Sequence, residues 1–497
     1  MSAATDSASR SDNGTRYELV VGLEVHCQLA TATKIFCRCE TSFGDAPNVN
    51  TCPVCLGLPG ALPVLNANAV RLATRAALAL GCTVHETSVF ARKNYFYPDL
   101  PKGYQISQFD RPLATGGAID VGAEAGTESR LIGITRVHME EDAGKSIHDR
   151  YAEWTAVDLN RAGTPLVEIV SEPDMRSAHE AGAYLRQLKQ ILEYTAVSDA
   201  NMEEGSLRVD VNISVRLRGA TELGTKTEIK NLNTFSGVER AIDIEYARQC
   251  ALLDAGGAVV QETMLWDGAR EQIRPARSKE GSHDYRYFPD PDLPPLELSP
   301  AFVSAQRGTL PELPRARRAR FVSAYGVTWS EAEQLTASAE LAGYFEAVAA
   351  ESGHAKRAAN WVLGVVLAAL NASGRVITDA PVLSTRVATL IRLEADGVVS
   401  NTAARQLFAL LCERDDDPRA LAEREGLIKV TDDFALVQWV EEVLAEQPTE
   451  AARFLAGEVK LQGVLVGHVM RKSKGAADPR RVNQLLASRL SESSGNV

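Results

Sequence analysis

The stretch Tyr17-Glu-Leu-Val-Val-Gly-Leu-Glu-Val-His-Cys-Gln28 decides the fold of the first part of the chain. Every second residue from Tyr17 to Cys27 is apolar, which is typical of a β-strand with one buried face. Glu24 and His26 share the other face, because side chains on a strand repeat every two residues. A carboxylate beside an imidazole can hold a metal ion or move a proton. The stretch therefore predicts a strand that carries chemistry.

Two close pairs of cysteines follow this strand. Cys37 and Cys39 are the first pair, and Cys52 and Cys55, after twelve intervening residues, are the second. Four thiols in two tight pairs have the spacing of a tetrahedral zinc site. The alternative, four free buried thiols, is disfavoured because the pairs are so close.

Bulk properties bound the class of protein. The chain has 497 residues, of which 45% are hydrophobic and 24% charged, and this length allows roughly two to four domains. The net charge of −12 argues against a protein that coats nucleic acid through its overall charge, although local basic patches remain compatible with it. The eight cysteines fit a reducing compartment better than a disulfide framework.

The hydropathy pattern does not indicate a membrane protein. Residues 1–16 are polar and are predicted to be disordered. The longest strongly apolar run, residues 361–370, is too short to span a bilayer. We therefore expect a soluble cytoplasmic protein with no membrane partner.

Three later segments repeat the alternation of the first strand. The last two adjoin through Gly219 and Gly224 and are predicted to form an antiparallel hairpin. The fold class is therefore predicted as α+β, with a mostly antiparallel sheet that has an apolar back and a polar face. The three segments are residues 131–140, 207–217 and 225–230.

The predicted polar face carries several acids from separate segments. Acids at the end of a strand, here Glu140 to Asp142, can offer oxygens to Mg²⁺. Glu168 lies in an apolar run, where a lone charge is costly, so it should have a cation partner. The alternative is a solvated face with cross-strand pairs through Arg208 or Lys226. The residues in question are Glu24, His26, His138, Glu140, Glu168, Asp210 and Glu228.

An aromatic-rich segment, residues 94–108, is predicted to be a loop. Its polar tips are Lys102, Tyr104, Gln105 and Gln108. Functional residues concentrate on loops, but most loop residues have no such role. A surface turn with aromatic anchors is the alternative interpretation.

The rest of the chain is predicted to be helical from Pro311 onward. Ser330 and Glu333 have the spacing of a capping box, and residues 361–370 predict a core helix. The charged residues 415–426 indicate a linker. The predicted domains, after the disordered N-terminus, are a sheet domain with a zinc-binding insertion (17–299), a helical domain (300–424) and a C-terminal helical unit (425–497).

Residues 457–489 form a basic region in this acidic chain, with a local charge of +5. Such a cluster is most often solvated surface, but a basic tail can also grip a polyanion. Its basic residues are Lys460, Arg471, Lys472, Lys474, Arg480, Arg481 and Arg489.

These motifs, in this order, closely resemble the B subunits of the aspartyl/glutamyl-tRNA(Asn/Gln) amidotransferases. The resemblance runs from about residue 17 to the last helix. A large insertion between the sheet and the helical part would be expected of the related archaeal-type E subunit, and its absence favours B. The motifs are GLEVH (22–26), the cysteine pairs, YFYPDLPKGYQ (95–105), HMEEDAGK (138–145), DLNRAGTPLVE (158–168), EEGSLRVD (203–210), KTEIKNLN (226–233) and LVGHVMRKSKG (465–475).

The resemblance implies an ATP-dependent, glutamine-hydrolysing carbon–nitrogen ligase. The B subunit would phosphorylate the side-chain carboxylate of misacylated Glu-tRNA(Gln) or Asp-tRNA(Asn), and Mg²⁺ would neutralise the phosphate charge. An A subunit would supply ammonia from glutamine, a small C subunit would complete a heterotrimer, and the C-terminal unit would bind tRNA. A non-catalytic tRNA-binding adaptor is the alternative, but a phosphate-binding scaffold would carry Lys and Arg on the sheet face.

The resemblance also implies site residues. Lys102, Tyr104 and Gln105 would contact the nucleotide or the acceptor end of the tRNA. The zinc ion would be structural, because four thiols leave no open position, and zinc-dependent hydrolysis is disfavoured for the same reason. The catalytic residues, which would also be the magnesium ligands, are Glu24, His26, Glu140, Glu168, Asp210 and Glu228.

Two choices among these residues stay open at the level of sequence. Either Glu140 or the adjacent Glu141 is the magnesium ligand, since both lie at the end of a predicted strand. Lys145, Arg161 and Lys226 are alternatives for contacts with phosphate.

Overall fold

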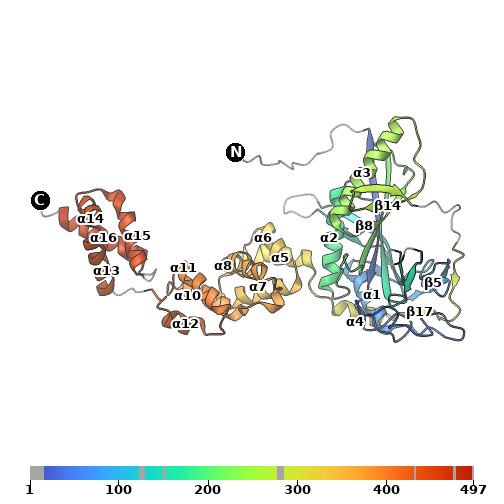
Figure 1. The fold of residues 1–497 in the computed structure, drawn as a ribbon, viewed down its shortest axis with the longest axis horizontal. Coiled ribbons are helices and arrows are strands. Elements are labelled where there is room, and N and C mark those ends of the chain that lie inside the picture. Colours follow the sequence, from blue (N-terminus) through green and yellow to red (C-terminus); the bar gives the residue numbers. More distant parts are fainter. Residues whose placement is uncertain are drawn as a thin grey trace. The chain divides into compact units, whose positions relative to one another are not determined.

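The computed structural model describes residues 16–122, 129–148, 151, 153–276, 285–429, 433–473 and 477–494. The predicted disordered N-terminus lies outside these residues except for Arg16. The chain divides into two compact units, Met1–Pro314 and Arg315–Val497, and each is described here by itself (Figure 1). The domain boundaries expected near residues 300 and 424 stay predictions.

The first unit is organised around β1 (Tyr17–Gln28), which lies within a 13-stranded sheet. β12 (Leu207–Leu217) and β11 (Pro165–Ser171) pair with β1 on its two sides, and both pairs are antiparallel. β13 (Thr227–Leu232) adjoins β12, and β8 (Leu131–Glu141) adjoins β11. The predicted hairpin of β12 and β13 is thereby confirmed.

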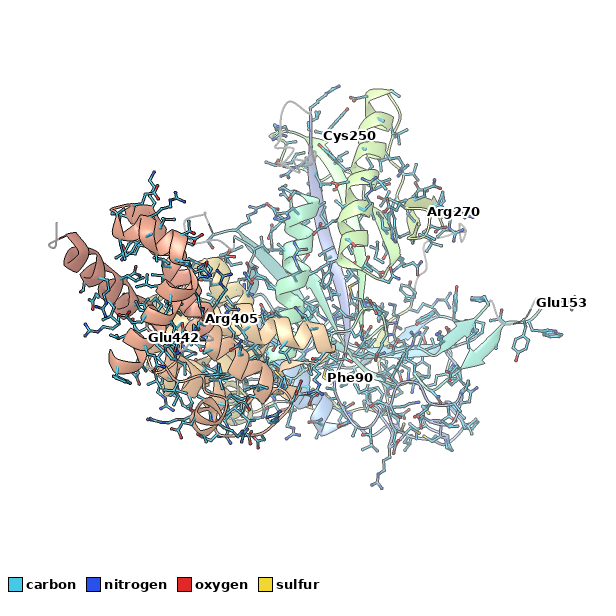
Figure 2. The ribbon with its side chains drawn as sticks, turned by 60° about the vertical axis from the view of Figure 1, so that its left-hand side comes forward. Phe90, Glu153, Cys250, Arg270, Arg405 and Glu442 are labelled. Carbon is cyan, nitrogen blue, oxygen red and sulfur yellow. The ribbon has the colours of Figure 1, made fainter. Side chains whose placement is uncertain are left out.

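One strand pair departs from the antiparallel pattern. β14 (Thr263–Asp267) runs parallel to β13, and all other strand pairs among the described residues are antiparallel. β15 (Gln272–Pro275) then returns antiparallel to β14, through a turn that carries Arg270 (Figure 2). A mostly antiparallel sheet followed by a helical region confirms the predicted α+β class.

The remaining strands of the first unit are short, because turns interrupt the chain between them. They complete one edge of the main sheet or form two-stranded pairs beside it. They are β2 (Thr83–Val84), β3 (Thr87–Ser88), β4 (Ala91–Asn94), β5 (Tyr104–Ser107), β6 (Ala114–Thr115), β7 (Ala118–Asp120), β9 (Lys145–Ile147), β10 (Ala156–Asp158), β16 (Phe288–Pro289) and β17 (Leu296–Glu297).

Three helices of the first unit begin at capping side chains. The side chains of Asn66, Ser177 and Thr234 accept hydrogen bonds from the first-turn amides, which otherwise lack partners. Apolar residues recur at helical spacing in the first two helices and less regularly in the third, whose buried face includes polar residues. The helices are α1 (Ala67–Ala79), α2 (Ala178–Tyr194) and α3 (Phe235–Asp254).

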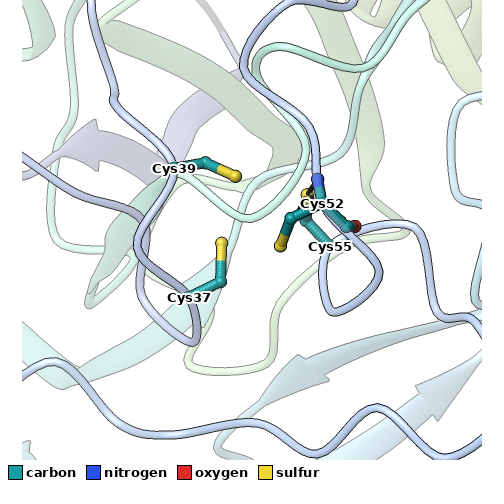
Figure 3. Close-up of side chains that lie close together, drawn as sticks. All are labelled: Cys37, Cys39, Cys52 and Cys55. Atoms are coloured by element: carbon teal, nitrogen blue, oxygen red, sulfur yellow. Dashed lines mark hydrogen bonds between the residues drawn. The ribbon is translucent and has the colours of Figure 1, made fainter.

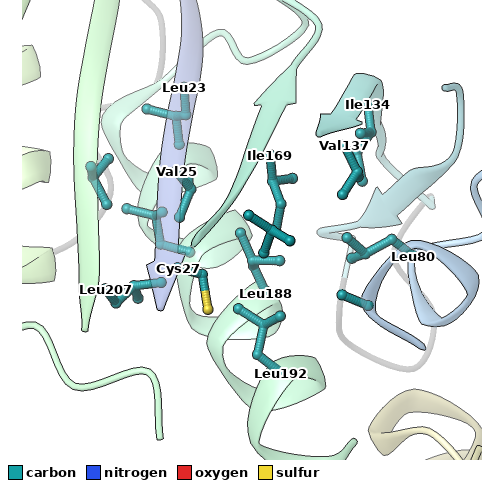
Figure 4. Close-up of a cluster of buried hydrophobic side chains, with 14 of the residues drawn as sticks. Leu23, Val25, Cys27, Leu80, Ile134, Val137, Ile169, Leu188, Leu192 and Leu207 are labelled. Atoms are coloured by element: carbon teal, nitrogen blue, oxygen red, sulfur yellow. The ribbon is translucent and has the colours of Figure 1, made fainter. Parts of the chain in front are cut away.

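The apolar face of the sheet packs against these helices. Leu188 and Leu192 of α2 lie beside Val25 and Ile169 of the sheet, and all four side chains are fully buried (Figure 4). Burial of such side chains contributes roughly 1.5–3 kcal/mol each. The opposite face of β1, which carries Glu24 and His26, stays half-buried. The fold therefore presents the polar face predicted from the sequence.

The segment predicted as a loop, residues 94–108, is partly a strand. Tyr104 and Gln105 belong to β5, which pairs with β4. The Gln105 side chain is buried and donates a hydrogen bond to the carbonyl oxygen of Glu141 at 2.7 Å. Gln108 is also buried, and its Oε1 accepts from the amide of Met139 at 3.0 Å. The prediction of exposed polar tips is wrong for both glutamines, because their amide groups satisfy backbone groups of β8.

The second unit is helical and contains two separate apolar cores. α4 (Pro300–Gly308) precedes it and packs with Phe302 and Val303 on the core of the first unit. The first helical core is built from α5 (Pro314–Tyr325), α6 (Trp329–Leu335), α7 (Ala339–Ser352), α8 (Ala355–Trp361), the π-helical turn Val362–Val366, α9 (Leu367–Ser373), the 3₁₀ turn Ile377–Asp379, α10 (Ser384–Ala395), α11 (Asn401–Leu411) and α12 (Pro418–Arg424).

The second helical core belongs to the C-terminal helices. Leu436, Phe454, Leu465 and Leu486 are fully buried within it. Its elements are α13 (Asp433–Glu446), α14 (Pro448–Leu455), the 3₁₀ turn Val459–Leu461, α15 (Gln462–Lys472) and α16 (Pro479–Ser494).

Two local predictions for the second unit are wrong. The capping box is formed by Thr328 and Glu331, two residues before the predicted pair. The predicted linker, residues 415–426, contains α12, because Asp417 caps a helix that Pro418 begins. Leu421 is fully buried in the first helical core, so this charged segment is part of the folded unit.

Candidate metal and catalytic sites

β1 supplies one residue to each of two clusters on the polar face of the sheet. Glu24 stands opposite Asp210 of β12, and His26 stands opposite Glu168 of β11. We call His26, Glu140 and Glu168 the histidine cluster, and Glu24, Asp210 and Glu228 the acid cluster. Within each cluster, one possible ligand atom per residue lies within 4.8 Å of the others. The structure thus divides the six predicted magnesium ligands into two sets of three.

In the histidine cluster, Nε2 of His26 lies 3.8 Å from a carboxylate oxygen of Glu140 and 3.8 Å from one of Glu168. Nε2 of His138 lies 3.1 Å from Glu168, and the Ser107 hydroxyl donates to Glu140 at 3.3 Å. Glu140 is 3% exposed and Glu168 9% exposed. These values exclude a solvated face as the explanation of this cluster.

The two buried carboxylates differ in protonation behaviour. Burial and the charge of Glu168 raise the pKa of Glu140. Burial also acts to raise the pKa of Glu168, but the hydrogen bond from His138 and the charges of both histidines lower it well below its usual range. Two carboxylates this close repel each other when both are ionised, and a divalent cation between them relieves that repulsion. The donor set therefore fits a hard cation such as Mg²⁺.

The acid cluster already holds a cation from the chain itself. Nζ of Lys230 lies 2.5 Å from Asp210 and 2.9 Å from Glu228. Burial alone would lower the pKa of Lys230. The charges of Asp210 and Glu228 outweigh this effect and raise the pKa above its usual value. The side chain of Asn212 donates to Glu24 at 2.9 Å. Because an ammonium group fits between these carboxylates, the same oxygens can converge on a small metal ion.

Lys230 is not among the residues predicted for the site, although the sequence contains the signal. Lys230 shares a face with Glu228, because the two residues are separated by one position on β13. A second pair on this face joins Arg208 to Asp142 at 2.9 Å. The ion pair of Lys230 with Asp210 joins the neighbouring strands β13 and β12, as the alternative expectation for this face has it. Arg208 pairs instead with an acid in the loop after β8.

The two adjacent acids at the end of β8 lie in different surroundings. Glu140 belongs to the histidine cluster, whereas Glu141 pairs with Lys102 and accepts a hydrogen bond from the amide of Ile106 at 2.8 Å. Successive side chains of a strand point to opposite faces. The geometry therefore favours Glu140 over Glu141 as a ligand on the side of His26.

The predicted nucleotide contacts lie around Glu141. Lys102 and Tyr104 line a cavity of about 120 Å³ together with Glu141 and Cys55. The guanidinium of Arg92 lies 4.2 Å from the ring centroid of Tyr104. The third predicted contact, Gln105, is buried.

Of the alternative phosphate contacts, Arg161 is held by the loop between β8 and β9. Its guanidinium donates to the carbonyl oxygens of Ala143 and Gly144 at 2.9 and 2.6 Å. Lys145 and Lys226 are exposed. Their possible roles toward phosphate stay predictions.

The four cysteines of the two pairs converge in space (Figure 3). Their sulfur atoms lie within 4.8 Å of one another, and those of Cys52 and Cys55 are 3.9 Å apart. Sulfur atoms around a tetrahedral zinc ion lie roughly 3.8 Å apart, given Zn–S bonds of about 2.3 Å. All four thiols are free of disulfide bonds. The donor set therefore fits zinc.

A buried lysine supports the cysteine cluster. Lys34 is 0% exposed, and its ammonium donates to the carbonyl oxygens of Asn50 and Leu159 at 2.6 and 3.3 Å. The hydrogen bond from Cys37 lowers the pKa of Cys55, and the charge of Lys34 acts in the same direction. A thiolate is the form that binds metal. The pKa is lowered at Cys55, whereas hydrogen bonding to Cys55 and burial raise it at Cys37, and burial raises it at Cys39.

Comparison with known proteins places the chain in the class of catalytic subunits of tRNA-dependent amidotransferases. Residues 19–304 match the family described as the GatB/GatE catalytic domain, and residues 343–490 match the GatB domain. The first match contains both clusters and all four cysteines. None of the helices in the described parts of the chain combines the length and apolarity that a membrane crossing needs.

The chain belongs to the family of aspartyl/glutamyl-tRNA(Asn/Gln) amidotransferase B subunits. It is 50% identical to the protein of that name from Alkalilimnicola ehrlichii over 475 residues, which are 95% of this chain and 99% of the relative. The B subunits of Chlorobium chlorochromatii and Syntrophotalea carbinolica are each 51% identical, over 95% and 96% of this chain and 99% of each relative. The resemblance inferred from the motifs is confirmed.

Proposed function

We propose that this chain activates the side-chain carboxylate of a misacylated tRNA, Glu-tRNA(Gln) or Asp-tRNA(Asn), by phosphorylating it with ATP. Its family relatives carry the name of that amidotransferase. The observation that carries the proposal is the pair of clusters on one sheet face, with Glu24 and His26 two residues apart on β1. A scaffold that only bound tRNA would gain nothing from buried carboxylates on this face, because they repel phosphate.

In this proposal the two clusters bind Mg²⁺, through Glu24, Asp210 and Glu228 and through His26, Glu140 and Glu168. Bound Mg²⁺ would neutralise the charge of the phosphates during transfer. His138 orients Glu168 through their 3.1 Å contact. Arg208 stands opposite His26 on β12, and its guanidinium is held by Asp142 at 2.9 Å. In this proposal the side chains bind the metal ions and orient their ligands, and none of them forms a covalent bond with the substrate.

Zinc at Cys37, Cys39, Cys52 and Cys55 would have a structural role. The buried Lys34 links this segment to the loop at Leu159, so the metal would fix the wall of the cavity that Lys102 and Tyr104 line. Lys102 and Tyr104 stay candidates for contacts with the nucleotide or the acceptor end of the tRNA. Gln105 is buried, so it would act indirectly, by positioning the residues that it contacts.

The proposed assembly is a heterotrimer with an amidase A subunit, which supplies ammonia, and a small C subunit. The basic C-terminal helices would bind the tRNA. These partners, and a cytoplasmic location, are proposals that rest on the family and on the composition of the chain.

Phosphoryl transfer tests the function directly. The purified complex is given γ-labelled ATP, Mg²⁺ and Glu-tRNA(Gln) without an ammonia donor. We expect label on the tRNA-linked glutamate with wild type and a loss of at least about tenfold, or 1.4 kcal/mol, with Glu140→Gln or Glu168→Gln.

Glu193→Gln is the matched control, because Glu193 pairs with Lys189 on α2 away from the clusters. Normal phosphorylation by both cluster variants, with tRNA still bound, would show that the activation chemistry lies elsewhere. Loss of phosphorylation that is fully explained by loss of tRNA binding would favour the adaptor.

A further inference from the structure

Lys230 and a metal ion at the acid cluster would both be bound by the carboxylates of Asp210 and Glu228. The ammonium of Lys230 contacts Asp210 and Glu228 at 2.5 and 2.9 Å. The ligand atoms of these acids and of Glu24 lie within 4.8 Å of one another. A divalent ion on the same oxygens would lie within a few ångströms of the ammonium, where like charges repel strongly.

Lys230 has a route out of the cluster. Its side chain is 40% exposed, and a lysine carries its charge on a flexible four-carbon stem. The acids are more restricted, because Asn212 donates to Glu24 at 2.9 Å and the Thr263 hydroxyl donates to Glu228 at 3.1 Å. When a metal ion enters, the lysine is therefore the group that can move.

We propose that Lys230 is a built-in competitor of the divalent cation at the acid cluster. In the metal-free chain the ammonium neutralises Asp210 and Glu228 and keeps their oxygens close together. On metal binding it is displaced toward solvent, so each binding event breaks two charge-assisted contacts. The cluster therefore binds metal more weakly than its three carboxylates alone would. This inference rests on the proposed function only in taking the acid cluster as a metal site.

The test is Mn²⁺ binding to the full-length chain without ATP or tRNA, measured by titration calorimetry and by the electron paramagnetic resonance signal of free Mn²⁺. Glu24→Gln, introduced into each background, identifies the affinity that belongs to the acid cluster. We expect Lys230→Met to tighten that affinity by about tenfold, or 1.4 kcal/mol. Lys230→Gln, which keeps polar contacts without the charge, should act in the same direction, whereas Lys230→Arg should not tighten binding.

Lys189→Met is the matched control. Lys189 lies in the same unit and pairs with Glu193 at 3.1 Å, so its removal changes the net charge by the same amount. Mn²⁺ affinity unchanged or weakened in both Lys230→Met and Lys230→Gln would overturn the proposal. So would equal tightening by Lys189→Met, because that would reflect net charge alone.

Thermal stability gives a second readout. Without metal, Lys230→Met leaves mutually repelling carboxylates and should lower the melting temperature, and Mn²⁺ should restore it. A loss of stability that Mn²⁺ does not restore would mean that Lys230 has only a structural role. Absence of any Glu24-dependent Mn²⁺ site would overturn the proposal and the metal assignment of this cluster. Failure of phosphoryl transfer alone would overturn the activity and leave the competition intact.

Discussion

Glu140 and Glu141 show how much one residue position matters. One carboxylate lies in the histidine cluster and the other pairs with Lys102. The sequence predicted that an acid of this pair would face His26 but not which one, because a strand that ends at residue 140 leaves the direction of Glu141 undefined. β8 includes Glu141, and the alternation of the strand then directs the two side chains to opposite faces.

The buried carboxylate of Glu245 predicts a pH-dependent stability. It accepts hydrogen bonds from Thr227 at 2.7 Å and from Gln249 and Arg248 at 2.8 Å. Burial acts to raise its pKa, but these donors lower it below the usual value. Glu245→Gln should lower the free energy of unfolding at pH 7 by about 2 kcal/mol, since it removes the charge that these donors stabilise.

Linkage fixes the direction of the pH effect at Glu245. A group with a lowered pKa in the folded state stabilises the fold above its unfolded pKa, about 4.3 for Glu, and loses that effect as the pH falls through the folded value. The difference between wild type and Glu245→Gln in urea unfolding should therefore be constant from pH 6 to 8 and shrink below about pH 4. A difference that grows on acidification would contradict the assignment.

Some elements were predictable from the sequence and others were not, for physical reasons. β1 and α2 have clean apolar periodicity, and Ser177 marks the start of α2. α3 lacks that signal, because its buried face includes the polar residues Glu245 and Gln249. α12 is short and lies in a charged stretch of the chain, so its buried Leu421 and the Asp417 cap distinguish it from a linker. Periodicity fails where polar groups are buried with partners.

The cysteine segment should depend on metal for its stability. Cys37→Ser removes one of four converging sulfurs, so bound zinc should be lost and the melting temperature lowered. Metal analysis and calorimetry measure the two effects. Cys250→Ser is the control, because Cys250 is also half-buried but lies on α3 (Figure 2). Full stability of Cys37→Ser after loss of its metal would rule out a structural role for zinc.

The connection between β12 and β13 depends on a glycine. A Cβ atom at Gly224 would lie 2.1 Å from the carbonyl oxygen of Val215, so the backbone would have to move. Gly224→Ala should destabilise the chain by about 2 kcal/mol in urea unfolding. Gly308→Ala should not, because a Cβ there meets open space. Equal stability of the two variants would contradict this packing.

At the scale of the whole molecule, the candidate metal sites and the basic region belong to different units of the chain. The clusters and the cysteines lie in the first unit, and the basic residues 457–489 lie among the C-terminal helices with their own core. Lys474 lies outside the described residues. The overall charge did not predict the basic region, because a net charge of −12 for the whole chain conceals the local excess of Lys and Arg in residues 457–489. The local count along the sequence did predict it.

The structure also divides these basic residues into two groups. Lys472 pairs with Glu442 and Glu446 at 2.8 and 2.5 Å, whereas Arg471 and Arg480 are exposed. If this region binds tRNA, Arg471→Gln with Arg480→Gln should weaken binding and reduce the slope of log affinity against log salt by roughly one to two units. Lys472→Gln should have a smaller effect, because acids already neutralise its charge. Filter binding across a salt series measures the affinity and its salt dependence. An unchanged slope in the double variant would argue against tRNA binding by residues 457–489.

The position of β1 between β11 and β12 fixes the distance between the two clusters. Glu24 and His26 are two residues apart on one strand, which fixes the separation of the two clusters at roughly 7 Å. Substitutions on the flanking strands can tune the affinity of either cluster by itself. Their spacing cannot be tuned in this way, because a one-residue slip of β1 would turn both side chains into the core together. A change in the register of β1 would therefore remove both clusters together, whereas a substitution on a flanking strand affects one of them.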